Sequence, residues 1–186
     1  MPEAGIPEAP PVLVPPAGED ALLVAIQSAL APRPGVLPAA TALSHFGEHA
    51  QGWLALAALG AVLRPQNRRA YVTAGVGALA AHAAAIAIKL AVGRRRPDHP
   101  AIAVNVGTPS KLSFPSAHAT SSTAAAVLLG KASGLPLPAV IVPPMVLSRL
   151  VLGVHYPSDV ATGVAVGGVV ATLTSRIGRR MKESGS

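Results

Sequence analysis

The sequence predicts an all-α fold, a polytopic membrane helix bundle of about five transmembrane helices. Only 12% of the 186 residues are charged, whereas soluble domains usually carry about 25% charged residues. The chain is 51% hydrophobic although aromatic residues make up only 3%, so Ala, Val and Leu supply the apolar content. Several apolar segments also end in basic residues, as membrane helices commonly do.

The composition also excludes some classes of function. The chain has no cysteine, so disulfides and thiolate metal sites are ruled out. Its net charge of +7 does not indicate nucleic-acid binding, because the basic residues lie at the ends of apolar segments and form no stripe interleaved with aromatics. We therefore expect the bilayer, and not nucleic acid, as a partner.

Residues 1–48 are expected to form an N-terminal part distinct from the rest. The first 20 residues are rich in proline and lack hydrophobic periodicity, which is typical of a disordered tail. The following segment EDALLVAIQSAL predicts a short helix that is interfacial or packs on the bundle, because it is too short to cross a bilayer. A membrane domain is expected over 49–180 and a C-terminal tail over 181–186.

The membrane domain contains five apolar segments that we expect to be spans. They are residues 50–63, 70–92, 116–130, 135–153 and 158–178. The first is short, and a backward extension through PAATALSHFGEH is an alternative. Pro143 and Pro144 are expected to kink the fourth. Gly163 and Gly167 form a GxxxG motif in the fifth, which ordinarily gives close helix packing and alternatively an oligomer contact.

Five spans place the loops alternately on two sides of the membrane. One side, with the loop 64–69, the turn at Lys131 and the C-terminal tail, carries eight basic residues against one acid. Short cytoplasmic loops are enriched in Lys and Arg, so this side is expected to be cytoplasmic. The protein is then a multi-pass plasma membrane protein whose opposite, extracytoplasmic side holds the polar residues described next.

Polar residues from four expected helix ends gather on that opposite side. They are Lys89, Arg96, Ser116, His118, Arg149, His155 and Asp159. Ionisable residues at membrane depth are functional candidates by default. These helix ends therefore predict an active site at one membrane face.

The residue types suit a phosphate group. Lys89, Arg96 and Arg149 can neutralise a phosphate dianion, and arginine binds it with a bidentate fork. Ser116 is expected to cap the third span, whose N-terminus favours anions. Asp159, in the first turn of the fifth span, can orient His155 as a nucleophile.

Three motifs in the same order resemble the type 2 phosphatidic acid phosphatase (PAP2) superfamily. KLAVGRRRP fits Lys-x6-Arg-Pro, PSAH resembles Pro-Ser-Gly-His, and SRLVLGVHYPSD fits Ser-Arg-x5-His-x3-Asp. The resemblance implies metal-independent hydrolysis of a phosphate ester without a cofactor, through a phosphohistidine. It further implies that His155 is the nucleophile, Asp159 its partner and His118 the general acid. The resemblance also implies that Lys89, Arg96, Ser116, Ala117 and Arg149 bind phosphate, although Ala117 stands where the family usually has glycine.

Within the superfamily the chain most resembles the small decaprenylphosphoryl-5-phosphoribose phosphatases of arabinan and cell-wall precursor synthesis. The expected substrate is therefore a lipid phosphate, a phosphomonoester on a polyprenyl-linked headgroup. Polyprenyl diphosphate and phosphatidylglycerophosphate phosphatases share the motifs and are alternatives, as are a vanadate-dependent peroxidase and a non-enzymatic lipid-binding membrane protein. The loop 93–115 is expected to contact the headgroup through Asp98, His99, Asn105, Thr108, Ser110 and Lys111.

Other polar residues receive ordinary interpretations. Arg94 and Arg95 are expected to be interfacial charges, with auxiliary contacts to the headgroup as the alternative. His45 and His49 with Glu48 invite a zinc site, but His-x3-His at an interface is weak evidence, and no metal is assigned to them or to His82.

Overall fold

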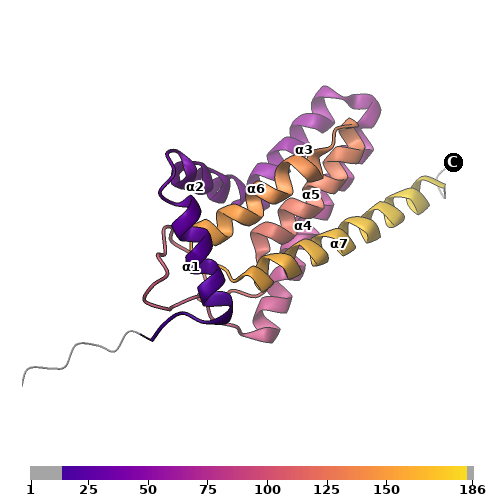
Figure 1. The fold of residues 1–186 in the computed structure, drawn as a ribbon. Helices are drawn as coiled ribbons and strands as arrows, with labels where there is room; N and C mark the ends of the chain where they lie inside the picture. Colours follow the sequence, from indigo (N-terminus) through magenta and orange to yellow (C-terminus); the bar gives the residue numbers. More distant parts are fainter. Residues whose placement is uncertain (1–13, 184–186) are drawn as a thin grey trace, which may run out of the picture.

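The computed structural model describes residues 14–183, and the regular structure in that range is helical. Figure 1 shows the helices as an elongated bundle, with the shorter N-terminal helices at one end. The elements are α1 (Gly18–Leu30), α2 (Val36–Gly47), the 3-10 turn η1 (Glu48–Ala50), α3 (Gln51–Leu63), the 3-10 turn η2 (Pro65–Asn67), α4 (Arg68–Val92), α5 (Ala117–Ser133), α6 (Leu137–Val151) and α7 (Pro157–Glu183).

The expected bundle of apolar helices is confirmed. Two of the described helical stretches, Pro65–Val92 and Pro157–Arg180, are long and apolar enough to cross a membrane. The other expected spans form α3, α5 and α6, which have 13, 17 and 15 residues. These are shorter than the roughly 20 residues that a span needs.

Helix α5 forms the centre of the bundle and packs against α4, α6 and α7 (Figure 1). Small side chains allow this, because Ala124, Ala125 and Ala126 are completely buried where larger residues would hold the helices apart. A Cβ at Gly163 would lie 2.8 Å from the Ser116 carbonyl oxygen, and one at Gly167 would lie 2.4 Å from that of Thr120. This is the close helix packing expected for the motif, because that face of α7 lies against α5 of the same chain, and an oligomer stays a prediction.

The N-terminal helices pack on the end of the bundle that holds the site. The short helix expected over 19–30 is present as α1 and packs on α6 and α7. Its buried Gln27 bonds to the backbone of Ala103 and Val151, which ties α1 to the loop 93–116. The tail over residues 1–13 lies outside the described residues, and the division of the chain at residue 48 stays a prediction.

A sharp turn separates α2 from α3. His49 and Ala50 both adopt left-handed backbone angles, with φ of 48° and 60°. Non-glycine residues rarely do so, and the strain is tolerated where surrounding contacts enforce it. The first span therefore does not extend backward through α2, which instead lies against α6 and the start of α5.

Candidate active site

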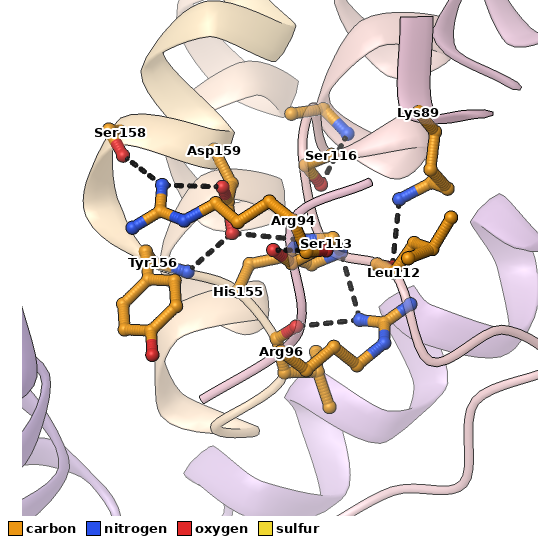
Figure 2. Close-up of polar contacts among 12 residues, drawn as sticks. Lys89, Arg94, Arg96, Leu112, Ser113, Ser116, His155, Tyr156, Ser158 and Asp159 are labelled. Carbon is orange, nitrogen blue, oxygen red and sulfur yellow. Dashed lines mark hydrogen bonds and ion pairs between the residues drawn. The ribbon is translucent and has the colours of Figure 1, made fainter. Parts of the chain in front are cut away.

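The expected site residues meet at one end of the bundle. Lys89 lies in the last turn of α4, Ser116 caps α5, and Arg149 lies in the last turn of α6. His155 precedes α7 and Asp159 lies in its first turn. Figure 2 shows the Lys89, Arg96, Ser116, His155 and Asp159 side chains around the loop that leads into α5. The structure thus brings together residues that are up to 70 positions apart in the sequence.

His155 and Asp159 form a buried pair. His155 is 3% exposed and Asp159 is fully buried, and His155 Nδ1 lies 3.6 Å from Asp159 Oδ2. The same Oδ2 accepts a hydrogen bond of 2.8 Å from the Tyr156 backbone N–H. This is the return half of a capping box, in which a residue in the first turn fixes the start of its own helix. The start of α7 thus holds the carboxylate beside the imidazole.

The second nitrogen of His155 faces a cation. Its Nε2 lies 3.3 Å from Arg96 Nη1. Arg96 is held by the carbonyl oxygens of Ser110, at 2.8 Å, and Val154, at 2.6 Å. Burial lowers the pKa of Arg96 to about 10, which leaves it charged at neutral pH. A phosphate bound by this guanidinium would therefore lie directly against Nε2 of His155.

Arg149 and Lys89 supply the other cations. Arg149 is 2% exposed, and its buried Nη2 has no hydrogen-bond partner among the described residues. A buried charged donor without a partner is costly, so an anion in the cavity would stabilise it. Lys89 Nζ donates to the Leu112 carbonyl oxygen at 3.0 Å (Figure 2). This bond directs the ammonium group toward the loop that ends at Ser116.

Ser116, Ala117 and His118 begin α5. The buried Ser116 hydroxyl accepts a bond from the Ala119 N–H at 3.4 Å and caps the helix. Ala117 is the first helical residue and lines the cavity. A helical backbone accepts alanine, so the departure from glycine is accommodated. His118 Nε2 lies 2.9 Å from the Ser44 carbonyl oxygen, so α2 holds the ring.

A cavity of about 470 Å³ connects these groups. Its lining includes five of the expected site residues with side-chain nitrogens, namely Lys89, Arg96, His118, Arg149 and His155. Of the loop residues expected to contact a headgroup, Thr108 and Ser110 line the cavity. Asn105 instead donates to the backbone of Ala103 and Val151, so it holds the loop.

Arg94 is part of the site and is not only the interfacial charge that the sequence predicts. Its Nη1 lies 3.0 Å from Asp159 Oδ1 and 2.6 Å from the Ser158 hydroxyl. Its Nη2 lies 2.6 Å from Glu19 Oε2, and its guanidinium stacks over the Tyr156 ring at 4.1 Å. Figure 2 shows the contacts with Asp159 and Ser158.

Glu19 extends this cluster to α1. It accepts bonds from the Ser158 N–H at 2.8 Å and from the Ser158 hydroxyl at 3.0 Å. Burial opposes its charge, but the bonds from Arg94 and Ser158 prevail and lower its pKa. No signal in the sequence links Glu19 to Arg94 or Ser158, which are 75 and 139 positions away. The run of three arginines at Arg94 to Arg96 is the one sequence feature that points to this cluster.

The electrostatics leave His155 uncharged. Burial lowers its pKa to about 4, and although Asp159 acts in the opposite direction, the nearby Arg96 and Lys89 add to the lowering. The ring is therefore neutral at pH 7 and can use a nitrogen lone pair. Among the described residues, no group of three or more His, Cys, Asp or Glu side chains is arranged to hold a metal ion.

Comparisons with known proteins identify the family of this chain. The model of the PAP2 superfamily matches residues 70–182. The chain is 64% identical over 163 residues to the decaprenylphosphoryl-5-phosphoribose phosphatase of Mycobacterium tuberculosis (strain CDC 1551 / Oshkosh), covering 88% of this chain and 92% of the relative. It is 69% identical over 148 residues to the protein of that name from Mycolicibacterium smegmatis, covering 80% of this chain and 82% of the relative.

Two solved structures share the fold. A transmembrane PAP2 type phosphatidylglycerolphosphate phosphatase from Bacillus subtilis aligns with a TM-score of 0.68 and 22% identity, over 86% of each chain. LpxE from Aquifex aeolicus aligns with a TM-score of 0.63 and 21% identity, over 84% of this chain and 93% of the other.

Proposed function

The chain belongs to the PAP2 superfamily and is a membrane phosphatase, and from this premise we propose that it removes the 5-phosphate of a polyprenyl-phosphoryl ribose through a phosphohistidine. The observation that carries the chemistry is the position of His155, with a carboxylate at one ring nitrogen and a guanidinium at the other. The names of relatives that are 64% and 69% identical support the ribose substrate.

The first half of the reaction transfers the phosphoryl group to the protein. Arg96, Arg149 and Lys89 bind the phosphate oxygens, with Ser116 at the N-terminus of α5 beside them. His155 Nε2 attacks phosphorus as the bond to the ribose oxygen breaks, and His118 gives its proton to that oxygen. Asp159 stabilises the imidazole, which becomes positively charged as the P–N bond forms.

The second half returns the protein to its starting state. Water attacks phosphorus, the P–N bond breaks, and His118 takes the proton that water loses. Inorganic phosphate leaves, and His155 is neutral again. Protein cations stabilise the charge in both halves, so this mechanism includes no metal ion.

Arg94 is a positioning residue in this mechanism. It holds Asp159 Oδ1 at 3.0 Å, while Asp159 Oδ2 faces His155 at 3.6 Å. Glu19 in turn holds Arg94. The carboxylate is thus fixed from two sides, and His155 keeps its orientation during attack.

We also place the site on the extracytoplasmic face of the plasma membrane. This placement is supported by the count of eight basic residues on the opposite side.

A panel of substrates tests the proposed function. Phosphate release by the purified protein is compared on polyprenyl-phosphoryl ribose 5-phosphate, free ribose 5-phosphate, a polyprenyl diphosphate and phosphatidylglycerophosphate, at matched concentrations in detergent. We expect the ribosyl lipid to react far faster than the other three. Equal rates on the lipid-linked and free sugar phosphates, or faster hydrolysis of either other lipid, would contradict the proposal.

A further inference from the structure

The catalytic cavity has a second end that the phosphate chemistry does not use. Its volume of about 470 Å³ exceeds what one phosphate group requires and suits a larger ligand. The second end is lined by His45 from the last turn of α2, by Glu48 and His49 from η1, and by His82 and Ile86 from α4. The mechanism above assigns no role to these side chains.

His49 and His82 face each other across this end. Their ring centroids are 5.8 Å apart. The Nδ1 atom of His82 is buried and has no hydrogen-bond partner among the described residues, although an unmade bond in such a place is unfavourable. His49 is held there by the left-handed turn, with φ of 48° and ψ of 25°. Strain of this kind is found where a side chain is held for binding.

The chemistry at this end differs from that at the phosphate end. Lys89, Arg96 and Arg149 are donors only, which suits an anion. Glu48 is an acceptor, and an imidazole offers both a donor and an acceptor. Hydroxyl groups, which also donate and accept hydrogen bonds, match this mixture of donors and acceptors.

The second end also lies where a sugar would be. His82 precedes Lys89 by seven residues on α4, a separation of about 10 Å along the helix axis. Ile86 lies between His82 and Lys89 on α4, and Leu90 follows Lys89. Both line the cavity, and they are 43% and 72% exposed. These apolar residues can contact a lipid chain that leaves the cavity beside α4.

We propose that Glu48, His49 and His82 form a subsite for the sugar hydroxyl groups of the substrate headgroup. The inference rests on the proposed function and names the residues that would make the phosphatase specific for its headgroup. The scissile phosphate occupies the cationic end, the sugar lies between α4 and the turn at His49, and the lipid chain follows Ile86 and Leu90.

Substrates that lack one hydroxyl test the subsite. Values of kcat/KM are measured for polyprenyl-phosphoryl ribose 5-phosphate and for its 2-deoxy and 3-deoxy analogues, with wild type and with Glu48→Gln, His49→Ala and His82→Phe. We expect wild type to lose about tenfold or more on at least one analogue, because a buried partner is left unpaired. We expect kcat/KM of at least one variant on the ribosyl lipid to fall by a similar factor. For that variant, kcat/KM on the deoxy analogue should be close to its value on the ribosyl lipid.

Two controls make the result specific. Gln51→Ala removes a polar side chain that is exposed at the start of α3, beside the turn at His49, and does not line the cavity, and it should behave as wild type. Competitive inhibition by inorganic phosphate should be unchanged in the three variants, because it reports the cationic end and correct folding.

The outcomes separate the inference from the function on which it rests. Wild type that does not hydrolyse the ribosyl lipid contradicts the proposed function. Wild type that hydrolyses all three sugars equally contradicts the subsite alone. Variants that slow the ribosyl and deoxyribosyl lipids by the same factor would place these residues against the linking phosphate or the chain, which also overturns the inference.

Discussion

Arg94 and His155 contact opposite oxygens of one buried carboxylate. Arg94 Nη1 lies 3.0 Å from Asp159 Oδ1, and His155 Nδ1 lies 3.6 Å from Asp159 Oδ2. An arginine from the loop after α4 therefore positions a carboxylate on α7, and the carboxylate faces the imidazole. The predictions below begin with this relationship.

Arg94→Ala should lower kcat and leave KM nearly unchanged, because Arg94 contacts Asp159 and does not line the cavity. Loss of an orienting partner behind a reactive group commonly costs about tenfold to a hundredfold in activity. Steady-state kinetics on the ribosyl lipid measure this effect, and Arg94→Lys should recover part of it by keeping a charge near Asp159.

Arg95→Ala is the matched control for Arg94→Ala. Its side chain is exposed in the same loop, so its removal should leave both kinetic constants near the wild-type values. Equal losses in the two variants would mean that general loop charge, and not the contact with Asp159, accounts for the effect.

Gly47→Ala should reduce activity by displacing the general acid. A Cβ at Gly47 would lie 2.8 Å from His118 Cδ2 and 3.2 Å from Met145 Cε, so the imidazole has to move. The Gly47 backbone, with φ of −82°, accepts alanine without strain. The loss in kcat/KM, which reports the first half of the reaction, should be large for an alkyl phosphate and small for p-nitrophenyl phosphate, whose leaving group needs no proton.

Gly168→Ala serves as the control for Gly47→Ala, because nothing lies within 4 Å of a Cβ at that position of α7. It should retain wild-type rates on both substrates. If Gly47→Ala lowers kcat/KM for both substrates by the same factor, His118 does not act as the general acid.

His155 should remain neutral far below the pH at which a free imidazole takes up a proton. Burial lowers its pKa to about 4, compared with about 6.5 for an exposed histidine. Between these values the unfolded chain binds a proton that the folded protein does not bind. The contribution of His155 to the free energy of unfolding is therefore fully present above about pH 6.5 and is lost as the pH falls toward 4.

NMR of histidine-labelled protein, with the His155 signal assigned by its loss in His155→Gln, measures this pKa directly. We expect no titration of that signal between pH 8 and about 5. A midpoint near 6.5 would show that the ring is accessible to solvent and would contradict the buried pair.

Much of the fold and of the site could be predicted from the sequence, because the controlling signals are local. Apolar segments and their basic ends predicted the helices, and the spacing from His155 to Asp159 predicted that the two side chains meet at the start of α7. The sequence did not reveal the left-handed turn at His49, because alanine and histidine carry no turn signal. It also did not reveal the contact between Glu19 and Arg94, because side-chain pairing between distant segments follows from packing.

The membrane side of the site can be tested with single cysteines, since the chain has none. Val104, which is 60% exposed in the loop 93–116, and Gln66, which is exposed in η2, are each replaced by cysteine. An impermeant maleimide applied to intact cells should label position 104 and leave position 66 unlabelled. The reverse pattern would place the active site on the cytoplasmic side.

The covalent phosphohistidine on His155 is the central claim, and rapid quenching tests it most directly. The protein is mixed with ribosyl lipid labelled with ³²P in the 5-phosphate and quenched in base within one turnover, because phosphohistidine survives base better than acid. We predict label on the peptide that contains His155, and none in His155→Ala, which should still bind inorganic phosphate. Label on the peptide that contains His118, or label that persists in His155→Ala, would contradict the assignment of the nucleophile.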